Sequence, residues 1–126
     1  MYYASEMLRD IAQEVIEENE NLEHLKGILP GIAFQYCTEV KKSGKKVVYA
    51  DTEKVKDKYK ALLPYYFIIT FYEPNCAELD DELLRVLMYH ELRHVGWDGD
   101  KCSIIPHDIE DFKDIIDKFG TSWINV

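Results

Sequence analysis

The run YYFIITFYE at residues 65–73 is the feature that most constrains the fold of this chain. It is rich in aromatic and β-branched residues and stops at Pro74, which is typical of a β-strand. A strand with one face in water alternates apolar and polar residues, whereas this run is apolar on both faces. We therefore expect an interior strand, in a sheet that has helices packed against it.

The segments around this strand predict an α+β fold, with a short, mostly antiparallel sheet, an active-site helix and flanking helices. We expect a helix capped by Ser5 and a hairpin around Ser43-Gly44. Asp80 and Gly96 mark the start and end of a later helix. The expected helices are 6–19, 51–64, 81–95 and 107–120, and the expected hairpin strands are 32–40 and 46–50.

Length and charge limit the classes of function. The 126 residues suffice for a single domain, 1–126, and a net charge of -9 argues against binding to nucleic acid or to anionic membranes. A cluster of lysines is interpreted as a solvated hairpin tip: Lys41, Lys42, Lys45 and Lys46. No run is long and apolar enough to span a bilayer, and the three cysteines suit a reducing cytoplasm.

The sequence MYHELRHVG at residues 88–96 places two histidines four positions apart, with Glu91 between them. Counting back from His94 through His90 reaches Leu87 and Leu83, so both histidines continue an apolar helical stripe and face inward. Glu91 lies on the neighbouring stripe. The opposite, solvent-facing side is predicted to carry Glu82, Arg85, Tyr89 and Arg93.

This arrangement predicts a zinc site. Two imidazoles one helical turn apart can reach one zinc ion at ~2.0–2.1 Å. A half-buried carboxylate beside them is costly unless a cation compensates its charge. The Glu91 side chain would contact a zinc-activated water and take its proton as the water attacks a carbonyl, which is the chemistry of metallopeptidases. Histidines that merely belong to the core are the alternative interpretation.

A catalytic zinc ion usually has three protein ligands and a water. His107 is the preferred third ligand, because imidazole suits zinc. Asp108 is the alternative, and whichever of the two is not the ligand would orient the other. Cys102 is a weaker candidate, and Asp98 and Asp100 are expected to be turn residues around Gly99.

Three segments together resemble the putative phage metallopeptidase family. They are ADTEKVKDKYKALLPYYFIITFYEPN at 50–75, YHELRHVG at 89–96 and PHDIEDF at 106–112. The likeness runs over roughly residues 28–119 and implies a small zincin-like core in a protein of phages and prophages. It implies zinc ligands at His90 and His94, a catalytic base at Glu91, and a third ligand from the His107-Asp108 pair. It also implies a peptide or protein substrate, bound by strand addition to the strand at 65–73, in the cytoplasm of the bacterial host.

Two other functions compete with a zinc peptidase. One is a non-catalytic binding module that keeps a metal site for stability, because a short chain has little room for a substrate cleft. The other is a metal-free phage accessory protein that binds a host protein. Metal content and hydrolysis of peptides discriminate among the three.

Overall fold

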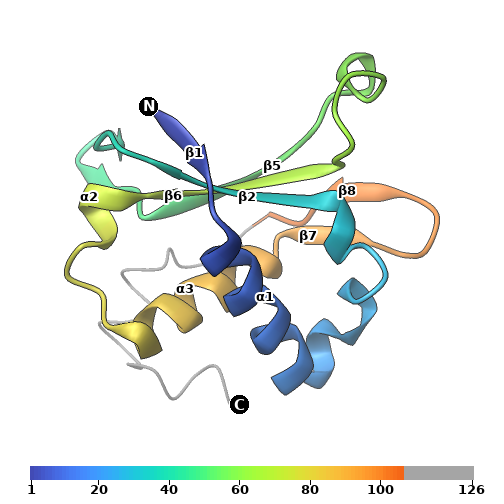
Figure 1. The fold of residues 1–126 in the computed structure, drawn as a ribbon, viewed down its shortest axis with the longest axis horizontal. Helices are drawn as coiled ribbons and strands as arrows, with labels where there is room; N and C mark the ends of the chain where they lie inside the picture. Colours follow the sequence, from blue (N-terminus) through green and yellow to red (C-terminus); the bar gives the residue numbers. More distant parts are fainter. Residues whose placement is uncertain (107–126) are drawn as a thin grey trace.

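The computed structural model describes residues 1–106, and its centre is a four-stranded sheet with helices on one face (Figure 1). The strand order is β1-β2-β6-β5. Strands β2 and β6 are parallel, and the other two pairings are antiparallel. The strand bounds are β1 Tyr2–Ala4, β2 Ile32–Cys37, β5 Ala50–Lys54 and β6 Phe67–Tyr72. This is the α+β fold with a mostly antiparallel sheet that the sequence predicts.

Strand β6 is the interior strand predicted from YYFIITFYE. It pairs with β2 on one side and β5 on the other. Phe67, Ile69 and Phe71 are fully buried on it. The apolar run is therefore covered as expected, and β6 forms the middle of the hydrophobic core.

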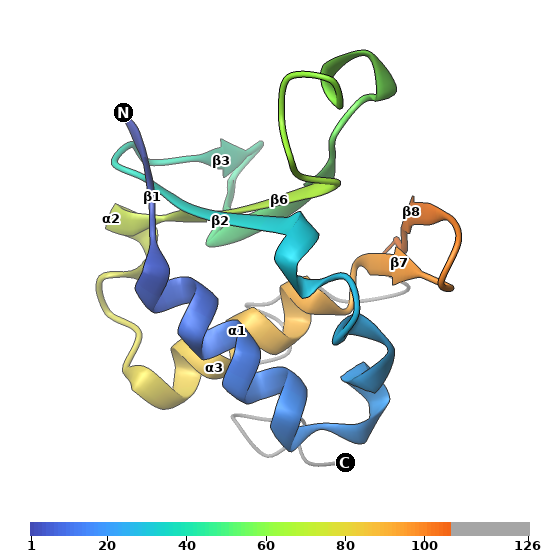
Figure 2. The same ribbon diagram turned by 45° about the vertical axis from the view of Figure 1, so that its right-hand side comes forward.

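Two helices, α1 (Glu6–Glu18) and α3 (Asp81–Leu92), lie side by side against the same face of the sheet (Figure 2). Both start at the predicted caps. Ser5 Oγ accepts a hydrogen bond from the Leu8 amide at 3.1 Å, and Asp80 Oδ1 accepts one from the Leu83 amide at 2.8 Å. The first turn of a helix leaves backbone N–H groups without hydrogen-bond partners inside the helix, and a capping side chain accepts a hydrogen bond from one of them.

The predicted helix at 51–64 is wrong. Residues 50–54 form β5, which pairs with residues 67–71 of β6, and only the short 3₁₀ helix η3 (Asp57–Tyr59) follows. The local pattern of charged residues favours a helix, but β6 is an apolar strand whose second edge needs a partner. Pairing of β6 backbone groups therefore overrides the helix propensity of this segment.

The predicted hairpin is correct only at its tip. Strands β3 (Lys42–Ser43) and β4 (Lys46–Val47) flank Gly44, whose φ of 64° is the left-handed conformation that glycine adopts freely. Residues 32–37 instead pair with β1 and β6. Turn chemistry is local and can be seen in the sequence, whereas the partner of a long strand is set by contacts distant along the chain.

The predicted end of the helix at 81–95 is also wrong. Helix α3 stops at Leu92, and Gly96 lies in strand β7 (Val95–Trp97), which pairs with β8 (Cys102–Ile104). A Cβ atom at Gly96 would lie 2.8 Å from the backbone oxygen of Ser103. The glycine is therefore needed for the close approach of two strands and not for a helix cap.

Tyr89 is a further correction, because it is buried and hydrogen-bonded to Asn21, not solvent-facing. Residues of η1 (Glu20–Leu25) pack against this face of the helix.

The remaining elements are the 3₁₀ helix η2 (Leu29–Gly31) and the single-turn helix α2 (Glu73–Cys76). The predicted helix at 107–120 lies outside the described residues. Among the described residues, no helix has the length and apolarity that crossing a membrane requires.

Candidate metal centre

The end of α3 brings together the three residues of the His-Glu-x-x-His sequence. His90 and Glu91 lie in the last turn of the helix, and His94 follows directly after it. One potential ligand atom from each of the three residues lies within 4.8 Å of the other two. The two imidazole rings are nearly perpendicular, with centroids 5.3 Å apart. The inward direction predicted from the helical stripe is thus observed for His90 and Glu91, which are both buried.

The β7–β8 hairpin fixes the ring of His94. Its Nδ1 lies 2.6 Å from the carbonyl oxygen of Ile105, and the Ile105 amide donates to the His94 carbonyl at 2.8 Å. A carbonyl oxygen only accepts, so Nδ1 carries a proton, and in the tautomer with that proton the lone pair of the ring is on Nε2. A histidine that binds a metal through one ring nitrogen usually donates a hydrogen bond from the other, often to a backbone carbonyl, as Nδ1 of His94 does here.

Glu91 is almost completely removed from water. This burial raises the pKa of its carboxyl group to about 7, while the hydrogen bond from Thr52 opposes the rise and the charge of Asp51 adds to it. The Thr52 hydroxyl lies 2.9 Å from the carboxylate oxygen Oε1 and 3.2 Å from the backbone oxygen of the same residue. A carboxyl group with a pKa near neutrality can both take up and release a proton at physiological pH.

Thr52 is the site residue that the sequence did not reveal. We expected it at the start of a helix, but it lies on β5, the strand beside α3. The sequence from Val48 to Val55 does not alternate between apolar and polar residues, so it carries no clear signal of a strand. Only the pairing of β5 with β6 places Thr52 beside the helix layer.

The remaining predicted ligands do not join the cluster within residues 1–106. Cys102, Asp98 and Asp100 are not part of the group formed by the two histidines and Glu91. Asp98 accepts hydrogen bonds from the amides of Asp100 and Lys101, at 2.9 and 2.7 Å, which confirms its role in a turn. His107 and Asp108, between which the sequence did not decide, lie outside the described residues.

The predicted role of β6 in strand addition is wrong, because both of its edges are already paired. In the described part of the chain, β5 is the edge strand next to β6. The same strand carries Thr52, which bonds to Glu91. Two buried tyrosines serve structural contacts. Tyr72 donates to Asp51 at 2.8 Å, and Tyr89 is bonded to Asn21.

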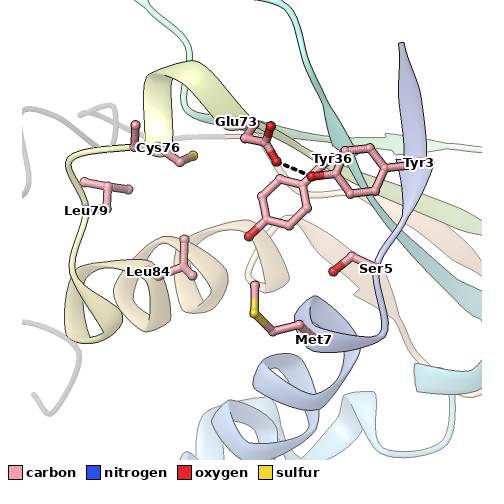
Figure 3. A pocket seen from close by; sticks show the side chains of 9 residues that line it. Tyr3, Ser5, Met7, Tyr36, Glu73, Cys76, Leu79 and Leu84 are labelled. Carbon is pink, nitrogen blue, oxygen red and sulfur yellow. Dashed lines mark hydrogen bonds between the residues drawn. The ribbon is translucent and has the colours of Figure 1, made fainter.

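A separate pocket of about 420 Å³ lies at the other end of α3 (Figure 3). Tyr3, Tyr36 and Glu73 line it on one side and Met7 and Leu84 on the other, and the Tyr3 hydroxyl is bonded to Glu73. None of the His90, Glu91 and His94 side chains lines this pocket. It is therefore not the candidate metal centre.

Fold and site together define a small α+β protein with a candidate metal centre built from imidazoles at the end of a helix. The chain belongs to the putative phage metallopeptidase family, whose model matches residues 1–126, the whole sequence. Membership implies a metal and a protein substrate. No curated protein and no solved structure matches the chain.

Proposed function

We propose that this protein is a zinc-dependent peptidase in which His90 and His94 bind zinc and Glu91 is the general base. The observation that carries the proposal is the convergence of two imidazoles and a carboxylate within 4.8 Å. His107 is the proposed third ligand, with Asp108 orienting it or taking its place. The proposed catalytic unit is the single domain 1–126, acting in the cytoplasm of a bacterial host.

The residues present suit a zinc ion. Imidazole nitrogen is a favoured zinc ligand, and the hydrogen bond from Nδ1 of His94 to Ile105 leaves Nε2 for the metal. The Glu91 carboxylate also lies beside the two rings. It accepts a hydrogen bond from the Thr52 hydroxyl of β5, which restrains its orientation. Glu91 is thus placed to contact a water molecule next to the metal.

When bound, a zinc ion supplies Lewis-acid chemistry: it polarises the scissile carbonyl and makes a neighbouring water more acidic. Glu91 takes the proton of that water during attack on the carbonyl carbon. It then returns the proton to the leaving amine as the carbon–nitrogen bond breaks. Thr52 orients the carboxylate during both transfers, and the backbone of β5 is available for an extended peptide.

Replacement of Glu91 tests this function. We expect Glu91→Gln to retain zinc, measured by elemental analysis of the purified protein, and to lower hydrolysis of a peptide library by at least ~100-fold, because the base is lost. Glu82→Gln is the matched control, since Glu82 is exposed on the same helix. It should retain both zinc and activity.

Other results would exclude parts of the proposal. Hydrolysis that persists in Glu91→Gln would show that another group is the base. Zinc bound by a wild-type protein that cleaves no peptide would favour a binding module that uses the metal for stability. Wild-type protein without any metal would favour the metal-free accessory protein.

A further inference from the structure

The loop between β5 and β6, residues 55–66, is here called the arm. It projects from the sheet at the end of the molecule where the β7–β8 hairpin lies, on the side away from the helices (Figures 1 and 2). Its base is closed by hydrogen bonds from the Val55 amide to the Tyr66 carbonyl, at 2.8 Å, and from the Tyr66 amide to the Gly31 carbonyl, at 2.7 Å. The arm is therefore anchored in the sheet.

The arm and the end of β5 are basic, although the chain as a whole is acidic. Residues 54–66 contain four lysines and one acidic residue, while the whole protein has a net charge of -9. The lysines occupy every second position: Lys54, Lys56, Lys58 and Lys60. Asp57 is bound to Lys60 at 3.0 Å, so an excess of positive charge remains on this part of the surface.

The arm also exposes apolar side chains. Leu62 is 78% exposed, and Tyr59, Leu63 and Tyr66 are each exposed by more than a third. The ammonium group of Lys58 lies 5.0 Å from the centre of the Tyr59 ring, and that of Lys60 lies 5.1 Å from the Tyr66 ring. Contiguous exposed apolar groups beside oriented charges are typical of an interaction surface.

The position of the arm connects it to the candidate centre. Thr52, which holds Glu91, is three residues before the start of the arm, a distance of roughly 10 Å along an extended strand. Strand β5, which leads into the arm, also contacts β8. The same hairpin holds His94, and it ends at Ile104 and Ile105, which are both exposed. A segment lying along β5 beside Glu91 would thus continue onto the arm.

We propose that the arm binds an acidic segment of the protein substrate that also carries apolar side chains, next to the bond that is cleaved. This inference rests on the proposed peptidase function and names its class of substrate. The lysines match carboxylates, and Tyr59, Leu62 and Leu63 match the apolar side chains. A nucleic acid or an anionic membrane offers many more negative charges, which the acidic remainder of the protein repels.

The experiment measures binding, so that it does not depend on turnover. Fluorescein-labelled twelve-residue peptides rich in Glu, Asp, Leu and Phe are titrated with the full-length Glu91→Gln protein, and fluorescence anisotropy gives the Kd. The comparison peptides carry Gln and Asn in place of Glu and Asp. We expect the acidic peptides to bind about tenfold more tightly at low ionic strength, and this preference to shrink with added salt.

Two pairs of variants locate the binding surface. Lys56→Gln with Lys58→Gln should weaken binding of the acidic peptides about fivefold. Lys42→Gln with Lys45→Gln changes the net charge by the same amount on the exposed β3–β4 hairpin and should leave the Kd within twofold. Leu62→Ser should also weaken binding, whereas Val40→Ser, at another exposed position, should not. All four side chains of the lysine pairs are exposed, so folding is expected to be unaffected.

Equal effects of the two lysine pairs, or equal Kd values for acidic and neutral peptides, would overturn the inference. So would binding of phosphatidylserine vesicles through the arm without discrimination between the peptides, because the arm would then serve a membrane. Failure of the proposed function has a different signature. The wild-type protein would then cleave no peptide, although the acidic peptides would still bind to the arm.

Discussion

At the scale of single residues, Glu91 is held in an environment that is costly for a carboxylate. It is buried beside His90 and His94, and the Thr52 hydroxyl supports it from the neighbouring strand. Removal of that hydroxyl leaves a buried acceptor without this partner, and a freely rotating carboxylate is a less effective base. Thr52 is therefore expected to be a positioning residue for the proposed general base.

We predict that Thr52→Val lowers kcat about 10- to 100-fold with little change in KM or in zinc content. Stopped-flow or steady-state assays on a cleaved peptide measure the first two quantities, and elemental analysis measures the third. Thr70→Val is the control: Thr70 is also buried, and its hydroxyl accepts a hydrogen bond from Gln35 at 2.9 Å, away from the centre. A similar loss of kcat in both variants would mean that stability, not positioning of Glu91, is affected.

The residues that could be predicted from the sequence are those whose direction depends on one helix. The period of 3.6 residues fixed His90 and Glu91 relative to Leu87, and the observed burial agrees with it. Thr52 could not be found in this way, because its role depends on which strand lies beside α3. Tyr89 was predicted to face solvent for the same reason, because its burial depends on packing with η1, where Asn21 bonds to its hydroxyl.

At the scale of elements, the β7–β8 hairpin orients one of the two imidazoles of the candidate centre. It returns the chain to α3 so that the Ile105 carbonyl meets the ring of His94 at 2.6 Å. The hairpin depends on Gly96, where an added Cβ would come within 2.2 Å of the Ser103 side chain and 2.8 Å of its backbone oxygen. The side chain could rotate away, but the backbone could move only by separating the two strands.

We predict that Gly96→Ala lowers the free energy of unfolding by about 1–3 kcal/mol and weakens zinc binding. Chemical denaturation measures the first effect, and competition with a chelator of known affinity measures the second. Gly27→Ala is the matched control, because the nearest atom to its added Cβ would be 3.9 Å away. Unchanged zinc affinity in Gly96→Ala would show that the hairpin is not needed to orient His94.

Sheet topology was the part of the fold that the sequence could not supply. The apolar run of β6 correctly predicted an interior strand, and Ser5 and Asp80 correctly predicted two helix starts. Each of these signals is local. The partners of β6, in contrast, are Ile32–Cys37 and Ala50–Lys54, and neither segment carries a mark of its pairing. The predicted helix at 51–64 failed because pairing of backbone groups outweighs a weak local preference.

At the scale of the whole molecule, the candidate centre joins elements that are distant in the sequence. Helix α3 supplies His90 and Glu91, and the segment after the helix supplies His94. Strand β5 supplies Thr52, and the chain after β8 supplies the carbonyl of Ile105. A metal that binds the folded arrangement and not the unfolded chain must stabilise the protein as a whole. Such an ion would also offset the cost of burying the Glu91 carboxylate. Zinc should therefore act on global unfolding and not only on the site.

We predict that zinc at 100 times its Kd stabilises the protein by ~2.7 kcal/mol, which corresponds to an increase in Tm of about 10 °C for a chain of this size. Differential scanning calorimetry with zinc and after treatment with a chelator measures the shift. His94→Ala should lose most of it because one ligand is missing, whereas His24→Ala should keep it because His24 is an exposed residue of η1. An equal shift in wild type and His94→Ala would place the zinc elsewhere and contradict the centre proposed at the end of α3.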